Sequence, residues 1–265
     1  MTLNRKLNTK FTKQLHQSIL SVLIKLFLSL PLIIFTNLSY ADNSFYASME
    51  PIPQDLQQKM IGNSWHEGCP INLNDLSYLR MSYWGFDNKS HLGDMIINQQ
   101  LAPEVIAIFK KLYDAHYPIE KMMIPEELIG GIKFSNTLDF AAFVANSDDT
   151  YGFFCRIDAQ NPKNISPHSY GTCIDLNPYY NPGVISPDLQ HYVKGIKYLD
   201  RNLQHIGMIR DNDAAIKAFM NSGWLWHGYA TQTDYMHFSK LITNHYQINH
   251  IDSVLPGEGI NTTNN

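Results

Sequence analysis

The chain has 265 residues, enough for one ordinary domain or for a large domain with appendages. Its 44% hydrophobic content, with 15 Tyr and 13 Phe, is typical of a globular protein with an aromatic-rich core. Acidic residues outnumber basic ones by 24 to 20, so the chain is a poor candidate for binding nucleic acid or anionic polymers by long-range attraction.

Residues 1–41 differ in kind from the rest of the chain. They carry five basic residues and no acidic one, so their removal leaves a more acidic protein. Leu26–Phe35 is a compact apolar run, and Ser39 and Ala41 place small residues at the −3 and −1 positions of a cleavage site. This arrangement predicts a signal peptide that is cleaved near Ala41, and therefore an exported protein that is periplasmic or secreted.

An uncleaved membrane anchor is the alternative for this segment. The apolar run has about half of the ~20 residues that a membrane-spanning helix needs, and Lys25 interrupts any extension of it. We therefore expect no stable membrane span after cleavage. The mature protein is then one domain over residues 42–250, followed by a flexible tail over residues 251–265.

Patterns of apolar residues predict the elements in the first half of the domain. Residues 42–75 contain three prolines and are expected to form an irregular lead-in. Tyr78–Phe86 and Leu92–Ile97 are predicted to form a hairpin. Apolar spacing at i, i+3, i+4 and i+7 predicts a helix from Ala102 to about His116. Ile119–Ile124 is predicted to form a strand, which is followed by a break at Gly130-Gly131. The pattern at Phe140–Asn146 fits either a strand or a helix, and Phe153–Ile157 is predicted to form a buried strand.

Two helices are predicted in the second half. One is a short helix at Tyr198–Leu203, and the other spans Asp213–Asn221, where Asp213 can cap the start and Gly223 can end the helix. Strands and helices mixed without a regular βαβ alternation predict the α+β class, with an antiparallel sheet and flanking helices.

The stretch from Ser166 to Pro178 brings one histidine and one aspartate close in sequence. Seven residues of extended chain between His168 and Asp175 would span ~23 Å, far more than two ligands of one ion allow. They can meet only if the backbone reverses, and Gly171 tolerates the positive φ of a tight reversal. Thr172–Leu176 can then form a strand that projects Asp175 into the site.

A second pair, Asp234 and His237, follows downstream. Three residues apart, the two side chains would face opposite sides of a regular strand. They can share a site if Asp234 lies in a turn and the strand starts near Met236. Two imidazoles, one coordinating carboxylate and a spare carboxylate are the parts of a catalytic zinc site.

The three cysteines are Cys69, Cys155 and Cys173. In an oxidising compartment two of them can pair and leave one over. We favour Cys69 with Cys155, because Cys173 lies between two candidate metal-site residues on an apolar strand. Three buried thiols are the alternative.

In context, these residues form a more specific pattern than their spacing alone. Ser166-x-His168-x-x-Gly171-x-x-x-Asp175, followed about sixty residues later by Asp234-x-x-His237, resembles the D-alanyl-D-alanine carboxypeptidase family of zinc peptidases. These belong to the LAS group, named for lysostaphin, D-Ala-D-Ala metallopeptidases and sonic hedgehog. The likeness covers most of residues 60 to 240 and extends to Ser82–Asp87 with His91 and Gly93, to Cys155-Arg156, to Tyr198–Arg201 and to Gly223–Trp226.

The resemblance implies a LAS-type fold and a role for each matching residue. His168, Asp175 and His237 match the zinc ligands, which leave the fourth position for water. Asp234 matches the acidic residue that serves as general base, and Arg156 matches a basic residue that steadies the developing oxyanion. Each role is chemically sensible, because the zinc keeps a net positive charge and a guanidinium presents a rigid donor fork.

The roles of other residues near these motifs have alternative interpretations. His91 either orients a metal ligand or is an ordinary hairpin histidine. Trp224 and Trp226 are expected in the core rather than along a substrate cleft. His227 stands where relatives are expected to have glycine, so the rim of the cleft differs from theirs.

The resemblance implies a zinc peptidase that cleaves peptidoglycan stem peptides with a zinc-activated water as nucleophile. It is either a D-Ala-D-Ala carboxypeptidase or an L-Ala-D-Glu endopeptidase. The alternative is a non-catalytic, zinc-containing module of the same fold that binds the cell wall. A third hypothesis is a zinc peptidase that attacks host or environmental peptides. An intact Asp234 beside His237 favours an enzyme, because a structural site needs no spare base.

The mature protein is predicted to begin near Asp42. The apolar run is too short to span a membrane and Ala41 suits signal peptidase. N-terminal sequencing of the exported protein measures this directly. Membrane-bound material that retains Met1 would contradict it.

Overall fold

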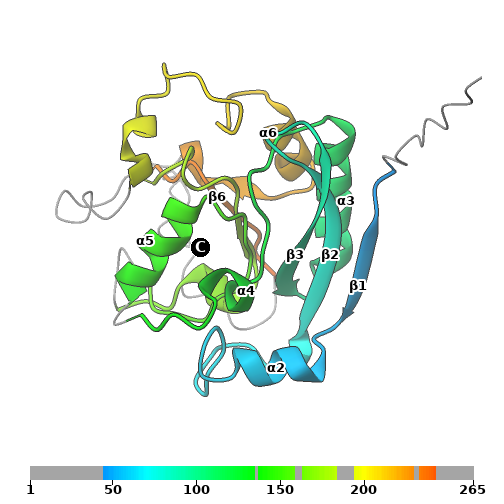
Figure 1. Cartoon of the computed structure of the whole chain (residues 1–265), viewed down its shortest axis with the longest axis vertical. Helices are drawn as coiled ribbons and strands as arrows, with labels where there is room; N and C mark the ends of the chain where they lie inside the picture. Colours follow the sequence, from blue (N-terminus) through cyan, green and yellow to red (C-terminus); the bar gives the residue numbers. More distant parts are fainter. Residues whose placement is uncertain (1–43, 135–136, 159–162, 184–193, 230–232, 243–265) are drawn as a thin grey trace, which may run out of the picture. The chain divides into compact units, whose positions relative to one another are not determined.

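We describe a computed structural model over residues 44–134, 137–158, 163–183, 194–229 and 233–242 (Figure 1). The predicted signal peptide and tail both lie outside these residues. All described residues belong to one compact unit. Within them, no helix has the length and apolar character needed to cross a bilayer.

Short helices and two small antiparallel sheets make up the described part of the chain (Figure 1). One sheet has the strand order β1-β2-β3 and the other has the order β4-β6-β5. The strands are β1 Ala47–Pro51, β2 Leu76–Trp84, β3 Ser90–Asn98, β4 Cys173–Asp175, β5 Leu225–Trp226 and β6 His237–Ser239. The α-helices are α2 Gln54–Met60, α3 Ala102–Asp114, α4 Pro125–Ile129, α5 Thr137–Ser147 and α6 Ala214–Met220. The predicted α+β class is confirmed, although the antiparallel strands form two sheets.

The predicted hairpin is the longest β structure. β2 and β3 pair from Leu76↔Asn98 to Trp84↔Ser90, around a turn in which Asn88 adopts a positive φ of 57°. One face of β2 packs against α3 (Figure 1). The helix presents the apolar stripe that the sequence predicted, with Val105, Ile108, Phe109 and Leu112 all buried.

The second sheet separates the core from the candidate site. β4 pairs with β6 so that Ile174 lies opposite Phe238 and Asp175 lies opposite His237. Successive side chains of a strand point to opposite faces. Ile174 and Phe238 are fully buried in the core cluster that includes α3 and α6. Asp175 and His237 therefore point to the other face.

The prediction of an irregular lead-in over residues 42–75 is wrong. This stretch contains β1, which pairs antiparallel with β2, and α2, which buries Leu56 and Met60 one turn apart. Pro53 precedes the first residue of α2 and is compatible with a helix start. Pro51 ends β1 and Pro53 precedes α2, so these two prolines bound the elements rather than preventing them.

Two predicted strands are absent from the described structure. Ile119–Ile124 and Phe153–Ile157 make only isolated β-bridges. The backbone N–H groups of Phe153, Phe154 and Cys155 donate to three different segments, at the carbonyls of Ile96, His168 and Ser64. Because consecutive bonds go to different partners, no ladder forms, although Phe153 and Cys155 are buried as predicted.

The remaining predicted helices lie close to helices of the structure. The undecided stretch at Phe140–Asn146 lies within α5. α6 starts where predicted, and the Asp213 side chain accepts a hydrogen bond from the Ile216 N–H as its cap. The helix predicted at Tyr198–Leu203 is instead a 3₁₀ helix at Lys194–Leu199.

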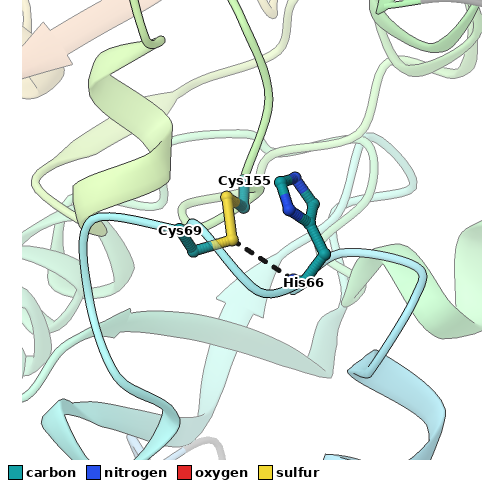
Figure 2. Close-up of side chains that lie close together, drawn as sticks. All are labelled: His66, Cys69 and Cys155. Atoms are coloured by element: carbon teal, nitrogen blue, oxygen red, sulfur yellow. Dashed lines mark hydrogen bonds between the residues drawn. A yellow bond between two sulfur atoms is a disulfide. The ribbon is translucent and has the colours of Figure 1, made fainter.

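Cys69 and Cys155 form a disulfide (Figure 2), which confirms the favoured pairing. The His66 backbone N–H donates to the Cys69 Sγ at 3.2 Å, and the His66 side chain lies beside the bridge. Cys173 is a free, buried thiol. The disulfide ties the lead-in covalently to the segment that carries Arg156.

Reduction of this disulfide should lower the free energy of unfolding by about 2–4 kcal/mol. The bridge joins residues separated by 86 positions, so its loss frees a long loop in the unfolded chain. Guanidinium denaturation with and without dithiothreitol measures the change. A Cys69→Ser/Cys155→Ser variant is the control and should not respond to the reductant. Equal midpoints for the parent protein in both conditions would refute the prediction.

Candidate metal centre

His168, Asp175 and His237 form a buried cluster. Each offers one ligand atom, and these atoms all lie within 4.8 Å of one another. The His168 Nε2 is 3.2 Å from the Asp175 Oδ2, and the His237 Nδ1 is 2.8 Å from the Asp175 Oδ1. The structure thus brings together the three residues that the sequence singled out as metal ligands.

His168 is placed by a tight turn on one side of Gly171. It lies in a 3₁₀ helix, Pro167–Tyr170, where the Ser166 side chain accepts from the His168 N–H. Gly171 ends this helix with φ at +64°, and a Cβ there would lie 2.6 Å from the Asn98 backbone nitrogen. Both the positive φ and the close approach to β3 require glycine. The predicted reversal at this residue is confirmed.

The tautomer of His168 follows from its surroundings. The Nδ1 lies 2.6 Å from the carbonyl oxygen of Gly152, which can only accept a hydrogen bond. The Nδ1–H therefore donates, which leaves the Nε2, 3.2 Å from the Asp175 Oδ2, as the ring nitrogen that can bind a metal. Histidines that bind metals are commonly oriented in this way by a backbone carbonyl.

Asp175 and His237 belong to a row of side chains that crosses the second sheet. They are direct cross-strand neighbours in β4 and β6. The pairing of β5 with β6 continues the row to His227, whose ring lies edge-on to the His237 ring at 4.7 Å. The His227 Nε2 is 2.7 Å from the Ser239 Oγ, and burial lowers the pKa of His227 to about 3. The row therefore ends in a neutral imidazole that sequence reasoning had assigned only to the rim.

Burial and mutual attraction set the charges in the cluster. Burial alone would raise the pKa of Asp175, but His168 and His237 outweigh it and hold the pKa well below the usual range. Burial lowers the pKa of His168. Burial also acts to lower the pKa of His237, but Cys173 and Asp175 reverse the effect and raise it. A metal ion binds only the neutral form of each imidazole, so zinc and protons compete for these two side chains.

Asp234 lies beside the cluster in a separate segment. It bridges to Gly183 and precedes the turn that leads into β6, which starts at His237 rather than at Met236. Its Oδ1 is buried without a hydrogen-bond partner, and a Cβ on Gly183 would lie 2.9 Å from this atom. Burial raises the pKa of Asp234 to about 7, although His237 acts in the opposite direction. The carboxyl group can therefore exchange a proton near neutral pH.

Arg156 approaches the cluster from the segment after the disulfide. Its Nη2 lies 3.4 Å from the Tyr151 hydroxyl, and its Nη1 donates to the Ile157 carbonyl at 3.3 Å. The Nε is buried and has no partner. The N–H on this Nε is therefore an unpaired donor.

Other residues noted in the sequence lie elsewhere. His91 is exposed on β3, where its Nε2 lies 2.8 Å from the Asp87 Oδ1, so it is an ordinary hairpin histidine. Trp224 and Trp226 are buried in the core, as predicted. His66 lies close to Cys69 and Cys155, but the disulfide leaves neither sulfur available as a thiolate ligand.

The donor set fits zinc. Two imidazole nitrogens and a carboxylate oxygen are the ligands of many catalytic zinc sites, which leave one position open. The Asp234 Oδ1 is a further buried acceptor without a hydrogen-bond partner. These features of the chain itself support zinc as the metal.

A comparison of the sequence with known protein families gives a match over the segment that carries these residues. Residues 159–240 match the family model described as D-alanyl-D-alanine carboxypeptidase. The resemblance to this family is thereby confirmed over residues 159–240, whereas the likeness noted over residues 60–158 stays a prediction. The match includes His168, Asp175, Asp234 and His237, whereas Arg156 precedes it. No curated protein and no solved structure matches the chain significantly.

The protein is predicted to bind one zinc ion per chain. His168→Ala removes one of three ligands and should abolish stoichiometric zinc after dialysis against a chelator. Metal content by mass spectrometry measures this. His66→Ala is the matched control, because this exposed imidazole lies at the disulfide, and it should leave the zinc content unchanged. Full zinc retention by His168→Ala would show that the ligand set is wrong.

Proposed function

We propose that the protein is an exported zinc peptidase that cleaves peptidoglycan stem peptides. The bond is that of a D-Ala-D-Ala carboxypeptidase or of an L-Ala-D-Glu endopeptidase, and the fold is of the LAS type. One observation carries the proposal. A buried His–Asp–His cluster adjoins a carboxyl group with an unpartnered oxygen, and these residues lie in the segment that matches the family.

The three clustered residues would hold the metal through the His168 Nε2, the Asp175 carboxylate and the His237 Nδ1. Bound zinc would polarise a substrate carbonyl and acidify a water molecule. The sheet register and the turn at Gly171 orient these side chains before substrate arrives. The remaining chemistry falls to Asp234 and Arg156.

Asp234 would act as the general base. Its Oδ1 takes the proton of the water that attacks the scissile carbonyl and then gives that proton to the leaving amine. Arg156 would bind the oxygen of that carbonyl as negative charge develops on it. The Nε of Arg156 is a buried donor without a partner, which is the form of preorganised donor that stabilises an oxyanion.

A non-catalytic cell-wall module with the same zinc site is the competing function. Such a module needs ligands but no base. An unpartnered buried oxygen destabilises a protein, because the desolvated group gains no hydrogen bond in return. The Asp234 Oδ1 is such an oxygen, and catalysis gives a reason for its retention. This observation favours the enzyme.

Asp234→Asn should retain zinc and lose about 10²–10⁴-fold in turnover, the usual contribution of general acid–base catalysis. Asparagine keeps the shape of the side chain but cannot accept a proton. The assay digests purified peptidoglycan with the mature protein, identifies the fragments by mass spectrometry, and measures zinc and initial rate on the same preparation.

Asp55→Asn, an exposed change in α2, is the control and should behave as the parent does. Normal zinc with a near-normal rate in Asp234→Asn would remove Asp234 from the mechanism. A parent protein that binds peptidoglycan but releases no fragment would favour the non-catalytic module.

A further inference from the structure

His66, Cys69 and Cys155 form a second cluster of side chains that can bind a metal, apart from the candidate centre (Figure 2). A ring nitrogen of His66 and the two sulfur atoms lie within 4.8 Å of one another. The two sulfurs are joined as a disulfide, so neither is a thiolate ligand in this state. Reduction by two electrons would convert the cluster into two thiols and an imidazole, a donor set that zinc binds in proteins.

The turn from His66 to Cys69 carries two of these three donors. The Cys69 N–H donates to the His66 carbonyl at 3.1 Å, and the His66 N–H donates to the Cys69 Sγ at 3.2 Å (Figure 2). Two ligands from one short turn are typical of structural zinc sites. The hydrogen bond to the sulfur favours a thiolate over a disulfide, because hydrogen bonds to ionised groups are about twice as strong as those between neutral groups.

Cys155 is held beside this turn by contacts other than the disulfide. Its N–H donates to the Ser64 carbonyl at 2.8 Å, just before the turn. Trp65 and Cys69 pack against the core cluster that contains Cys155. The Cα atoms of the two cysteines are 5.9 Å apart, and two thiolates at ~2.3 Å from one tetrahedral ion are roughly 3.8 Å apart. Both side chains can therefore reach one ion from the backbone positions that they already have.

His66 can complete the donor set. Its side chain is exposed, so the ring can turn without disturbing the core. The Nδ1 lies 2.9 Å from the Glu67 carbonyl oxygen, which can only accept a hydrogen bond, so the Nε2 is the nitrogen that keeps a lone pair. Histidines that bind metals are commonly oriented by such a bond from the other ring nitrogen to a carbonyl. The disulfide by itself requires no imidazole beside it.

We propose that the Cys69–Cys155 disulfide is the oxidised form of a second zinc site, which His66, Cys69 and Cys155 form when a dithiol reduces the bond. A thiolate of the dithiol attacks the sulfur of Cys69, the less buried of the two cysteines. The S–S bond breaks and Cys155 leaves as a thiolate. The second thiol of the reductant then displaces Cys69, and the dithiol becomes a disulfide. Zinc replaces the protons of the two thiols, and water takes the fourth position.

The zinc ion would replace the disulfide as a cross-link. It would join the same two segments of the chain, the turn at His66 and the segment that continues from Cys155 to Arg156. The lead-in then stays tied to the candidate site in both redox states. The proposal does not depend on the peptidase function proposed above.

Cobalt(II) is the probe, because it occupies zinc sites and thiolate ligands give it a charge-transfer absorption in the near ultraviolet. The full mature chain is titrated before and after treatment with a phosphine, which reduces the disulfide without offering thiols to the metal. Reduction should add one metal equivalent per chain and the thiolate absorption. The candidate centre and the free thiol of Cys173 are present in both states, so the difference between the titrations excludes them.

His66→Ala should raise the Kd of the added equivalent for zinc by at least about tenfold, because loss of a ligand costs no less than loss of a group that orients one. His91→Ala, which removes another exposed histidine, is the matched control and should leave this Kd unchanged. Cys69→Ser/Cys155→Ser should bind no added equivalent with or without the phosphine. Circular dichroism records whether each reduced protein is folded, and a chain that unfolds on reduction should refold when zinc is added.

Reduction that adds no metal equivalent overturns the proposal. An added equivalent that His66→Ala binds as tightly as the parent also overturns it, because the imidazole is then not a ligand. The measurements use no peptidoglycan, so a protein that cleaves none would contradict the proposed function and leave this test unaffected.

Discussion

The candidate site depends on the antiparallel pairing of β4 with β6, which sets Asp175 directly opposite His237. The register fixes this pair, and a slip of β4 by one residue would turn Ile174 into the site and Asp175 into the core. The apolar pair on the other face prevents such a slip, because Ile174 and Phe238 are fully buried against α3 and α6. The pairing of these two short strands thus determines both the packing of the core and the geometry of the site.

Glycine lets the other groups join this pair. At Gly171 the chain reverses with a positive φ and passes so close to β3 that any side chain would collide with the backbone, and this brings His168 to Asp175. At Gly183 the absence of a side chain leaves room for the Asp234 Oδ1. Four functional side chains, His168 with Asp175 and Asp234 with His237, therefore converge from two stretches of the chain without long secondary-structure elements. The chain between them contributes turns and single bridges rather than extended strands.

The sequence predicted those features that leave a local or a family signature. The stripe of α3, the β2–β3 hairpin, the cap at Asp213 and the reversal at Gly171 all follow from residues close together in the chain. The strands expected at Ile119–Ile124 and Phe153–Ile157 failed because strand pairing depends on partners distant in sequence, and here consecutive residues bond to different segments. Tyr151 was missed for the same reason. Nothing in its own neighbourhood indicates that it stacks on His168 and reaches Arg156. Its place a few residues before Arg156 was the only available signal.

Arg156 shows how an irregular segment can hold a side chain firmly. The segment around it belongs to no sheet, so no ladder fixes its direction. It is instead held at several points by different parts of the molecule. The Arg156 N–H donates to the Ser169 Oγ, whose hydroxyl donates in turn to the Arg156 carbonyl, and the preceding residue is covalently bound to Cys69. Ser169 follows His168 directly, so these hydrogen bonds hold the backbone of Arg156 next to the turn that carries a candidate metal ligand. The Arg156 Nη2 lies 3.4 Å from the hydroxyl of Tyr151, whose ring stacks on His168, so the side chain of the arginine is also held next to the cluster. A donor held at both its backbone and its side chain is preorganised toward a developing charge.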